Sequence, residues 1–334
     1  MRLLTFFLVS LFFGAHLWAQ EMPRAYADFN RDDVIPISLS TLKSGYLSLS
    51  LEGQTLQLPV NTTKSGANTQ SIQKTFQFGE INATIGGGGI FGQLRLNDTR
   101  FILTTESHGM WAVKMPQNAD YNSCGTENHT SNNQSLNAKT LNNSLQHKST
   151  GTVIDVLVVY DQAIANRYPG ELLEARVQQY IHVANQSYAN SQLDLSLRLV
   201  GLKQTGYNAN NANQTLLTHL QKTLAGTASY QGLTDIPAWR ANSGADLVVF
   251  LRTHDILTRG NCGIAYFPVG DGQQFNASYG INIMADGSSS WSICTDQLMV
   301  HEIGHNLGAG HHNAAPQYRF LPDAAGFAKL GQYG

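Results

Sequence analysis

The stretch HEIGHNLGAGH, residues 301–311, carries the strongest signal in this chain. His301 and His305 are four residues apart, so on a helix their imidazoles lie on the same face. That spacing lets both rings reach one zinc ion at about 2.0–2.1 Å. Gly308 accepts a positive φ, which lets the chain leave the helix sharply and bring His311 back as a third ligand.

Three histidines with an adjacent carboxylate indicate a catalytic zinc site. A structural zinc ion is closed by four protein ligands, whereas three ligands leave one position for water. Glu302 can accept a proton from the attacking water and later deliver it to a leaving amine. The alternative is a helix with exposed histidines. It is disfavoured because the five-position pattern arises by chance only about a few times in 100,000 chains of this composition.

Strands and helices are predicted to alternate ahead of this motif. Residues 153–160 form an apolar run typical of a central strand, and residues 171–191 carry apolar side chains at helical spacing. The remaining predictions are strands at 193–199, 245–251, 263–267 and 279–284 and helices near 216–224 and 295–308. This order predicts an α/β (α+β) fold with a five-stranded mixed sheet, helices over it, and the zinc-binding helix last.

Residues 20–116 predict a separate β-rich module. Leu47, Leu49 and Leu51 alternate with serines, further short apolar runs follow, and residues 86–89 are a turn of four glycines. We expect an antiparallel sheet that acts as a folding aid or cover. Residues 117–151 are rich in Asn, Ser, Thr and Gln and poor in large apolar residues, which predicts an exposed polar linker.

The first 19 residues are typical of an export signal. Arg2 supplies the positive charge, residues 3–13 are almost continuously apolar, and cleavage is expected after Ala19. The alternative is a membrane anchor, but the apolar core is short and no basic stop-transfer sequence follows. The prediction is a secreted protein, periplasmic only in transit, with no stable membrane insertion after signal removal.

Composition excludes some classes of partner. The chain has 334 residues and 36.5 kDa, with 21 Lys and Arg against 23 Asp and Glu, and a formal net charge of −2. Without a basic run, neither nucleic acid nor an anionic membrane surface is expected as the main partner. The length suits one large domain or two modest ones, and composition does not predict an oligomeric state.

The zinc motif resembles the extended signature of the metzincin metallopeptidases. VIDVLVVYDQA, NCGIAYF and SICTDQLMVHEIGH are similar to the reprolysin-like (adamalysin-type) branch and its bacterial secreted relatives, so the resemblance covers about residues 152–334. It implies a metzincin-like catalytic domain with one catalytic Zn²⁺ that hydrolyses protein or peptide substrates. By the same resemblance, His301, His305 and His311 are zinc ligands and Glu302 is the catalytic base.

The resemblance also implies a place for the substrate. An extended peptide would align against an edge strand, where it adds as a further strand. The residues that match this edge strand are Gly263, Ile264, Ala265, Tyr266 and Phe267.

The chain departs from the family pattern at two places. Reprolysins usually have Asp directly after the third histidine, whereas this chain has His312. Metzincins have a turn bearing a Met beneath the zinc, after the third ligand, whereas the last Met here is Met299. The expectation is a sequence that ends before this turn, with an incomplete C-terminal subdomain and weak activity.

The three cysteines receive separate interpretations. Cys262 begins the proposed edge strand and Cys294 begins the zinc-binding helix, so we predict a disulfide that closes a loop of about 30 residues. Two free thiols are the alternative. Cys124, in the linker, is the candidate thiolate that blocks zinc in a latent precursor, as in metzincin propeptides. It could instead be a free surface thiol, or pair with a cysteine beyond the present end.

The resulting hypothesis is a secreted zinc metalloendopeptidase precursor. It has a signal peptide at 1–19, a propeptide at 20–116, a linker at 117–151 and a catalytic domain at 152–334. One alternative is a catalytically silent, zinc-containing binding module. Another is a structural zinc domain, which would have a fourth protein ligand.

Overall fold

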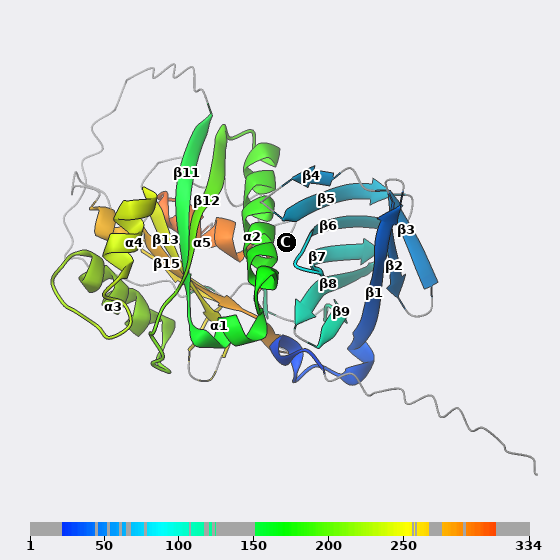
Figure 1. Cartoon of the computed structure of the whole chain (residues 1–334), viewed down its shortest axis with the longest axis horizontal. Helices are drawn as coiled ribbons and strands as arrows, with labels where there is room; N and C mark the ends of the chain where they lie inside the picture. The colour runs from blue at the N-terminus through cyan, green and yellow to red at the C-terminus, as the bar shows by residue number, and fades with distance from the viewer. Residues whose placement is uncertain are drawn as a thin grey trace, which may run out of the picture.

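Two units lie side by side in the chain (Figure 1). The N-terminal unit comprises residues 22–116 and the C-terminal unit residues 151–311. The computed structural model describes residues 22–43, 46–51, 54–59, 62–64, 68–76, 79–106, 108–116, 120–121, 124, 151–255, 257, 259–266, 276–289 and 292–311. None of the helices in these ranges is both long and apolar enough to cross a membrane. The predicted signal peptide lies outside the described residues.

A mixed five-stranded sheet forms the centre of the C-terminal unit, in the order β12-β11-β13-β15-β14. The parallel strands are β11 (Thr152–Tyr160), β12 (Leu195–Gln204), β13 (Leu247–Thr253) and β15 (Ile281–Asp286). Strand β14 (Gly263–Ala265) pairs antiparallel with β15 at the edge. The proposed edge strand is therefore shorter than predicted. Tyr266 follows it outside the strand, and Phe267 lies outside the described residues.

Helices cover both faces of this sheet. Val156 and Val158 of β11 share a buried core with α1 (Gln162–Arg167), α2 (Glu171–Asn190) and α5 (Leu298–Asn306). Leu157 and Val159 point to the other face and share a core with α3 (Asn213–Leu224) and α4 (Ile236–Ser243). The sequence predicted α2, α3 and α5. It missed α1 and α4, because helices of six and eight residues are too short for a distinct apolar period.

The N-terminal unit is built on a nine-stranded sheet in which every pair of neighbours is antiparallel, in the order β3-β2-β1-β9-β8-β7-β6-β5-β4. Two short 3₁₀ turns, η1 (Arg24–Tyr26) and η2 (Arg31–Asp33), precede it. Its strands are β1 (Val34–Lys43), β2 (Tyr46–Leu51), β3 (Gln54–Pro59), β4 (Thr62–Lys64), β5 (Thr69–Phe76), β6 (Gly79–Gly86), β7 (Gly89–Leu96), β8 (Thr99–Glu106) and β9 (Gly109–Lys114). Strand β5 was not predicted, because Ile72 is its one apolar residue before Phe76.

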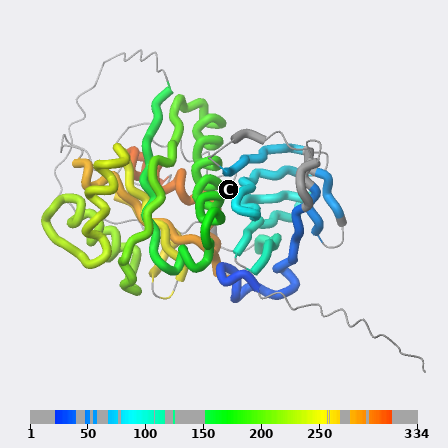
Figure 2. The backbone as a smooth tube through the Cα atoms, viewed as in Figure 1, coloured from blue at the N-terminus to red at the C-terminus, as the bar shows by residue number. Residues whose placement is uncertain are grey.

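Helix α2 is the element of the C-terminal unit that faces the N-terminal unit. Strands β5, β6 and β7 of the N-terminal unit run up to this helix (Figure 2) and pack against it. Thus α2 contacts its own sheet on one side and the N-terminal sheet on the other.

Part of the predicted linker is paired with the C-terminal unit. Asp120–Tyr121 (β10) pairs in parallel with β17 (Ser292–Ile293), which also pairs with β16 (Ser288–Ser289). Farther along, Cys124 forms a parallel bridge with Gly263 of β14. These residues of the predicted linker are thus held to the C-terminal unit by backbone pairing, and Cys124 is half-buried and not fully exposed as predicted. Residues 125–150 lie outside the described part of the chain.

Candidate metal centre and active site

Helix α5 and the turn after it bring the three histidines together. The helix ends at Asn306, and Gly308 adopts a φ of +93°, in the left-handed region that favours glycine. The backbone N–H of Gly308 donates to the carbonyl of His305 at 2.9 Å, and that of Ala309 donates to Gly304 at 2.8 Å. These bonds reverse the chain, so His311 returns to the face that carries His301 and His305.

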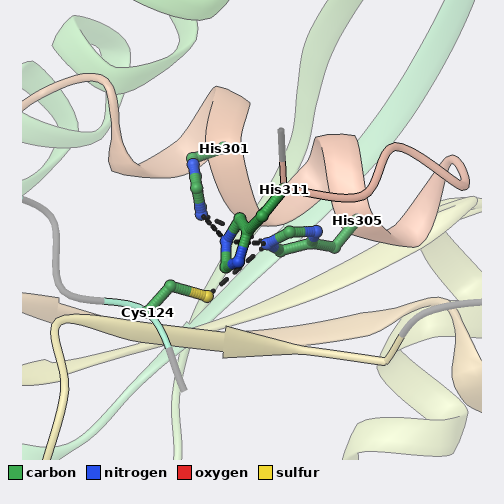
Figure 3. Close-up of side chains that lie close together, drawn as sticks. All are labelled: Cys124, His301, His305 and His311. Carbon is green, nitrogen blue, oxygen red and sulfur yellow. Dashed lines mark hydrogen bonds between the residues drawn. The ribbon is translucent and has the colours of Figure 1, made fainter. Parts of the chain in front are cut away.

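The three imidazoles point their Nε2 atoms at one another (Figure 3). His305 Nε2 lies 3.2 Å from His301 Nε2 and 3.1 Å from His311 Nε2, and the latter two are 3.2 Å apart. Cys124 approaches from the other side of the cluster, with its Sγ 3.5 Å from His305 Nε2. These four side chains form a group that could hold a metal ion.

The chemistry of this donor set fits zinc. Ligands at tetrahedral angles around zinc, with Zn–N of about 2.0–2.1 Å and Zn–S of about 2.3 Å, are separated by about 3.3–3.6 Å, close to the distances observed. The Nδ1 of His305 lies 2.8 Å from the carbonyl of Ala309. A carbonyl only accepts, so Nδ1 carries the proton and the Nε2 lone pair faces the cluster.

Burial keeps His301 and His305 neutral. It lowers the pKa of His301 to about 3, with His305 and His311 adding to the effect. It lowers the pKa of His305 to about 4, although the Ala309 carbonyl opposes the change. Neutral imidazole is the form that binds a metal, so the rings need not lose a proton to do so near neutral pH.

Glu302 lies beside this cluster and is fully buried. Its Oε2 accepts a hydrogen bond from the Cys124 thiol at 3.8 Å, and its Oε1 has no hydrogen-bond partner among the described residues. Burial raises the pKa of Glu302 to about 8, and the Cys124 bond opposes that rise. A carboxyl with such a pKa both takes up and releases a proton near neutral pH.

Gly263 provides the space in which the Glu302 carboxyl lies. A Cβ at this position would come within 2.2 Å of Glu302 Oε1 and 2.6 Å of its Cδ. The edge strand β14 and the zinc-motif helix therefore approach each other closely only because residue 263 has no side chain.

The Cys124 thiol is partly buried within this site. Burial raises its pKa above the ordinary value, and the neighbouring Glu302 raises it further. A bound cation acts in the opposite direction, because a thiol that coordinates a metal is deprotonated.

The predicted disulfide between Cys262 and Cys294 is present. It joins the residue before β14 to the segment just ahead of α5. The edge strand and the zinc-motif helix are thereby linked covalently, and Cys124 is the cysteine outside the disulfide.

Sequence reasoning missed Asn306, the residue after His305. It is buried, and its side-chain amide donates to the carbonyls of Tyr266 at 3.0 Å and Ile281 at 2.9 Å. Asn282 donates to its side-chain oxygen at 2.9 Å. Asn306 thus fixes the end of α5 against β15 and against the residue that follows β14. Its adjacency to the second histidine is the one sequence signal that could have marked it.

The two departures from the family pattern fall mostly outside the described residues. His312 and everything after it lie there, and so does the stretch in which a Met-bearing turn would be sought. Met299 lies on α5 and is buried in the core of the C-terminal unit.

Comparison with known proteins identifies the family. Residues 150–324 match the reprolysin-type model described as Metallo-peptidase family M12, which is more than half of the chain. The chain belongs to metallo-peptidase family M12. Members of this family are zinc-dependent, which agrees with the cluster of three histidines and one cysteine.

Relatives of this M12 chain include two bacterial enzymes, each named peptidyl-Asp metalloendopeptidase. That of Pseudomonas aeruginosa strain PAO1 is 27% identical over 161 residues, which cover 47% of this chain and 25% of the relative. That of Stenotrophomonas maltophilia strain R551-3 is 30% identical over 170 residues, which cover 50% of this chain and 36% of the relative. The chain thus spans well under half the length of these relatives. Among solved structures, metalloproteinase-II from Bacteroides fragilis aligns with a TM-score of 0.37 and 12% identity, over 86% of this chain and 81% of that one.

Proposed function

We propose that the chain is the secreted precursor of a zinc metalloendopeptidase. Residues 1–19 are its signal peptide, 20–116 its propeptide, 117–151 the connecting segment and 152–334 its catalytic domain. The observation that carries the proposal is the convergence of three Nε2 atoms within 3.2 Å of one another beside a fully buried glutamate. His301, His305 and His311 would hold the zinc ion.

Glu302 is assigned the proton transfers of peptide hydrolysis. Zinc, when bound, polarises the scissile carbonyl and lowers the pKa of water. The Glu302 carboxylate accepts a proton from the attacking water and gives it to the amine of the leaving fragment. The raised pKa of Glu302 matches this double task, because the group must release the proton it has taken up.

Strand β14 is assigned the binding of the substrate backbone. It is the edge strand of the sheet, and its first residue touches the Glu302 carboxyl. A peptide added as a further strand along Gly263–Ala265 would pass close to both the zinc ligands and the base.

Cys124 is assigned the role of keeping the precursor latent. Its backbone bridges to Gly263 of the edge strand, and its thiol lies 3.5 Å from His305 Nε2. In this position it would occupy both the substrate's strand position and the fourth position on zinc. A substrate could therefore bind only after the segment around Cys124 has left.

The first experiment tests the enzyme activity. Casein hydrolysis should be abolished by a chelator and restored by zinc. The names of the relatives suggest peptides containing Asp as further substrates, with Asn-containing peptides as controls. A zinc-loaded catalytic domain that has been separated from its N-terminal fragment, and that binds casein without cutting it, would instead be a silent binding module.

The second experiment separates a latent enzyme from a structural zinc domain, since one cysteine and three histidines could also close a structural site. We compare Cys124→Ser with the parent before any linker cleavage. A latent enzyme predicts zinc retained on three histidines and early peptidase activity. A structural site predicts loss of zinc and of thermal stability, with no activity.

A further inference from the structure

The four glycines at residues 86–89 join β6 to β7 and lie against the start of α2. A Cβ at Gly87 would fall 2.6 Å from the backbone carbon of Glu171 and 2.7 Å from the backbone nitrogen of Leu172. A Cβ at Gly86 would lie 3.1 Å from the Ala175 Cβ. The absence of side chains therefore allows this hairpin to approach the backbone of the helix directly.

Phe91, two residues after this turn, is fully buried within the core of the C-terminal unit. Its ring meets Tyr168 edge to face with centroids 5.4 Å apart, and the Arg176 guanidinium lies 5.8 Å from its centre. Aromatic side chains anchored in a pocket of the partner are typical of residues that dominate binding energy.

Hydrogen bonds between side chains surround this apolar contact. Thr84 of β6 donates to Gln179 of α2 at 2.8 Å, and Asn82 donates to Gln186. Asn68 donates to Glu171 at 3.2 Å. Thr84 and Gln179 are buried, whereas Asn68 and Glu171 are exposed, so a buried centre is bordered by an exposed polar edge, as in interfaces between separable proteins.

These contacts are independent of the metal centre. None of them uses Cys124, the three histidines or Glu302. They join β6, β7 and Asn68 of the N-terminal unit to α2 and Tyr168 of the C-terminal unit, where β6 and β7 lie beside α2 (Figure 1). Cutting the linker removes the covalent connection between the units but leaves every one of these contacts in place.

We propose that the β6–β7 hairpin with Phe91 is a docking element that keeps the N-terminal unit bound to α2 as a separate chain after the linker is cut. The partner of this surface is the chain's own N-terminal fragment. The inference rests on the proposed function for the cut in the linker. It adds that release of the fragment, and not the cut alone, uncovers the edge strand β14.

The test compares two adjacent glycines. Gly87 and Gly88 both have positive φ, +57° and +79°, so a side chain strains the backbone at either one. The difference is that a Cβ at Gly88 has nothing within 4 Å. Gly87→Ala should therefore weaken docking, while Gly88→Ala is its matched control.

The experiment measures association and not activity. A site for a specific protease is inserted between residues 130 and 145 of the full chain, in a Cys124→Ser background with a chelator present, so that zinc and thiol play no part. After cutting, fragment association is measured by size-exclusion chromatography and by titration calorimetry. The parent and Gly88→Ala should co-elute, while Gly87→Ala should bind at least about 10-fold more weakly, because overpacking at a rigid contact costs that much.

A second pair guards against misfolding. Phe91→Leu removes the ring that enters the C-terminal unit, whereas Phe101→Leu removes a ring buried in the N-terminal unit's own core. Phe91→Leu should weaken fragment association at least about 10-fold, and Phe101→Leu should leave it within a few-fold of the parent. Separation of the parent's fragments on cutting, or equal affinities within both pairs, would overturn the proposal whether or not the protein proves to be a peptidase.

Discussion

Replacing Asp286 by Asn tests the buried ion cluster that supports the C-terminal unit. Asp286 ends β15 and is 1% exposed. Its carboxylate accepts two hydrogen bonds from Arg176, at 2.8 and 3.0 Å, and one each from the hydroxyls of Tyr168 and Tyr180, at 2.5 and 2.7 Å. Arg167 Nη1 lies 3.6 Å from Asp286 Oδ2 and donates to the Asp286 backbone carbonyl at 2.6 Å.

The pKa of Asp286 gives a first estimate of how much its carboxylate contributes to the free energy of unfolding. Burial alone raises this pKa, but Arg176 and then Arg167 outweigh burial, and the net result is a decrease from 3.8 to about 2. A change of about two units corresponds to about 2–3 kcal/mol of stability at neutral pH. Asp286→Asn also removes one of the two buried carboxylates beside each guanidinium, so that, among the described residues, Arg176 keeps only Asp296, at 2.6 Å, and Arg167 keeps only Glu106, at 3.8 Å. The full loss should therefore reach about 3–5 kcal/mol.

The sign of the pH dependence follows from the same value. The folded-state pKa lies below the unfolded one, so the stabilisation is complete above about pH 4 and is lost as pH falls through about 2. The stability difference between parent and Asp286→Asn should thus shrink by about 2–3 kcal/mol between pH 6 and pH 2.

Urea unfolding followed by circular dichroism measures both effects. The control is Asp155→Asn, which removes an equally close Asp–Arg pair, 2.6 and 2.7 Å to Arg198, whose side chain is 65% exposed. This exposed pair should contribute far less, because solvent screens it. A loss below about 1 kcal/mol for Asp286→Asn, or equal losses in the two variants, would refute the reasoning.

Three further predictions concern the site. Glu302→Gln should keep its zinc by elemental analysis and lose turnover by about 100-fold or more, since the base is removed but no ligand is; zinc loss would contradict this role. Gly263→Ala should also keep zinc and lower kcat, because the methyl group occupies the position of Glu302 Oε1; Gly206→Ala, whose Cβ would meet its nearest neighbour at 3.8 Å, is the control. Peptide mapping without reduction should recover Cys262 and Cys294 in one linked peptide, and replacing both by Ser should cost about 3–4 kcal/mol of stability by denaturation, given their separation of 32 residues.

Local spacing was enough to predict part of the site. His301 and His305 are one helical turn apart, and Gly308 permits the reversal that returns His311, so the relation between these rings depends on a few neighbouring residues. The long elements were predictable for a similar reason. In α2 the helical spacing of apolar side chains is repeated over 20 residues, and in β11 a continuous apolar run marks a buried strand.

Tertiary structure alone decided which distant residues share the site. Cys124 lies 181 residues before His305 in sequence yet contacts it, and Gly263 faces Glu302 because β14 pairs with β15 beneath α5. Asn306 likewise fixes two strands to the helix through carbonyls that any residue type would present.

The contact between the two units was likewise not predictable from the sequence. The sequence marked residues 86–89 as a turn of four glycines, but nothing in it indicated that helix α2 lies against that turn or that Phe91 enters the other unit's core. Periodicity reports which face of an element is buried and not what buries it. The choice of partner depends on the packing of the whole chain, where complementary shapes and buried polar groups must be satisfied together.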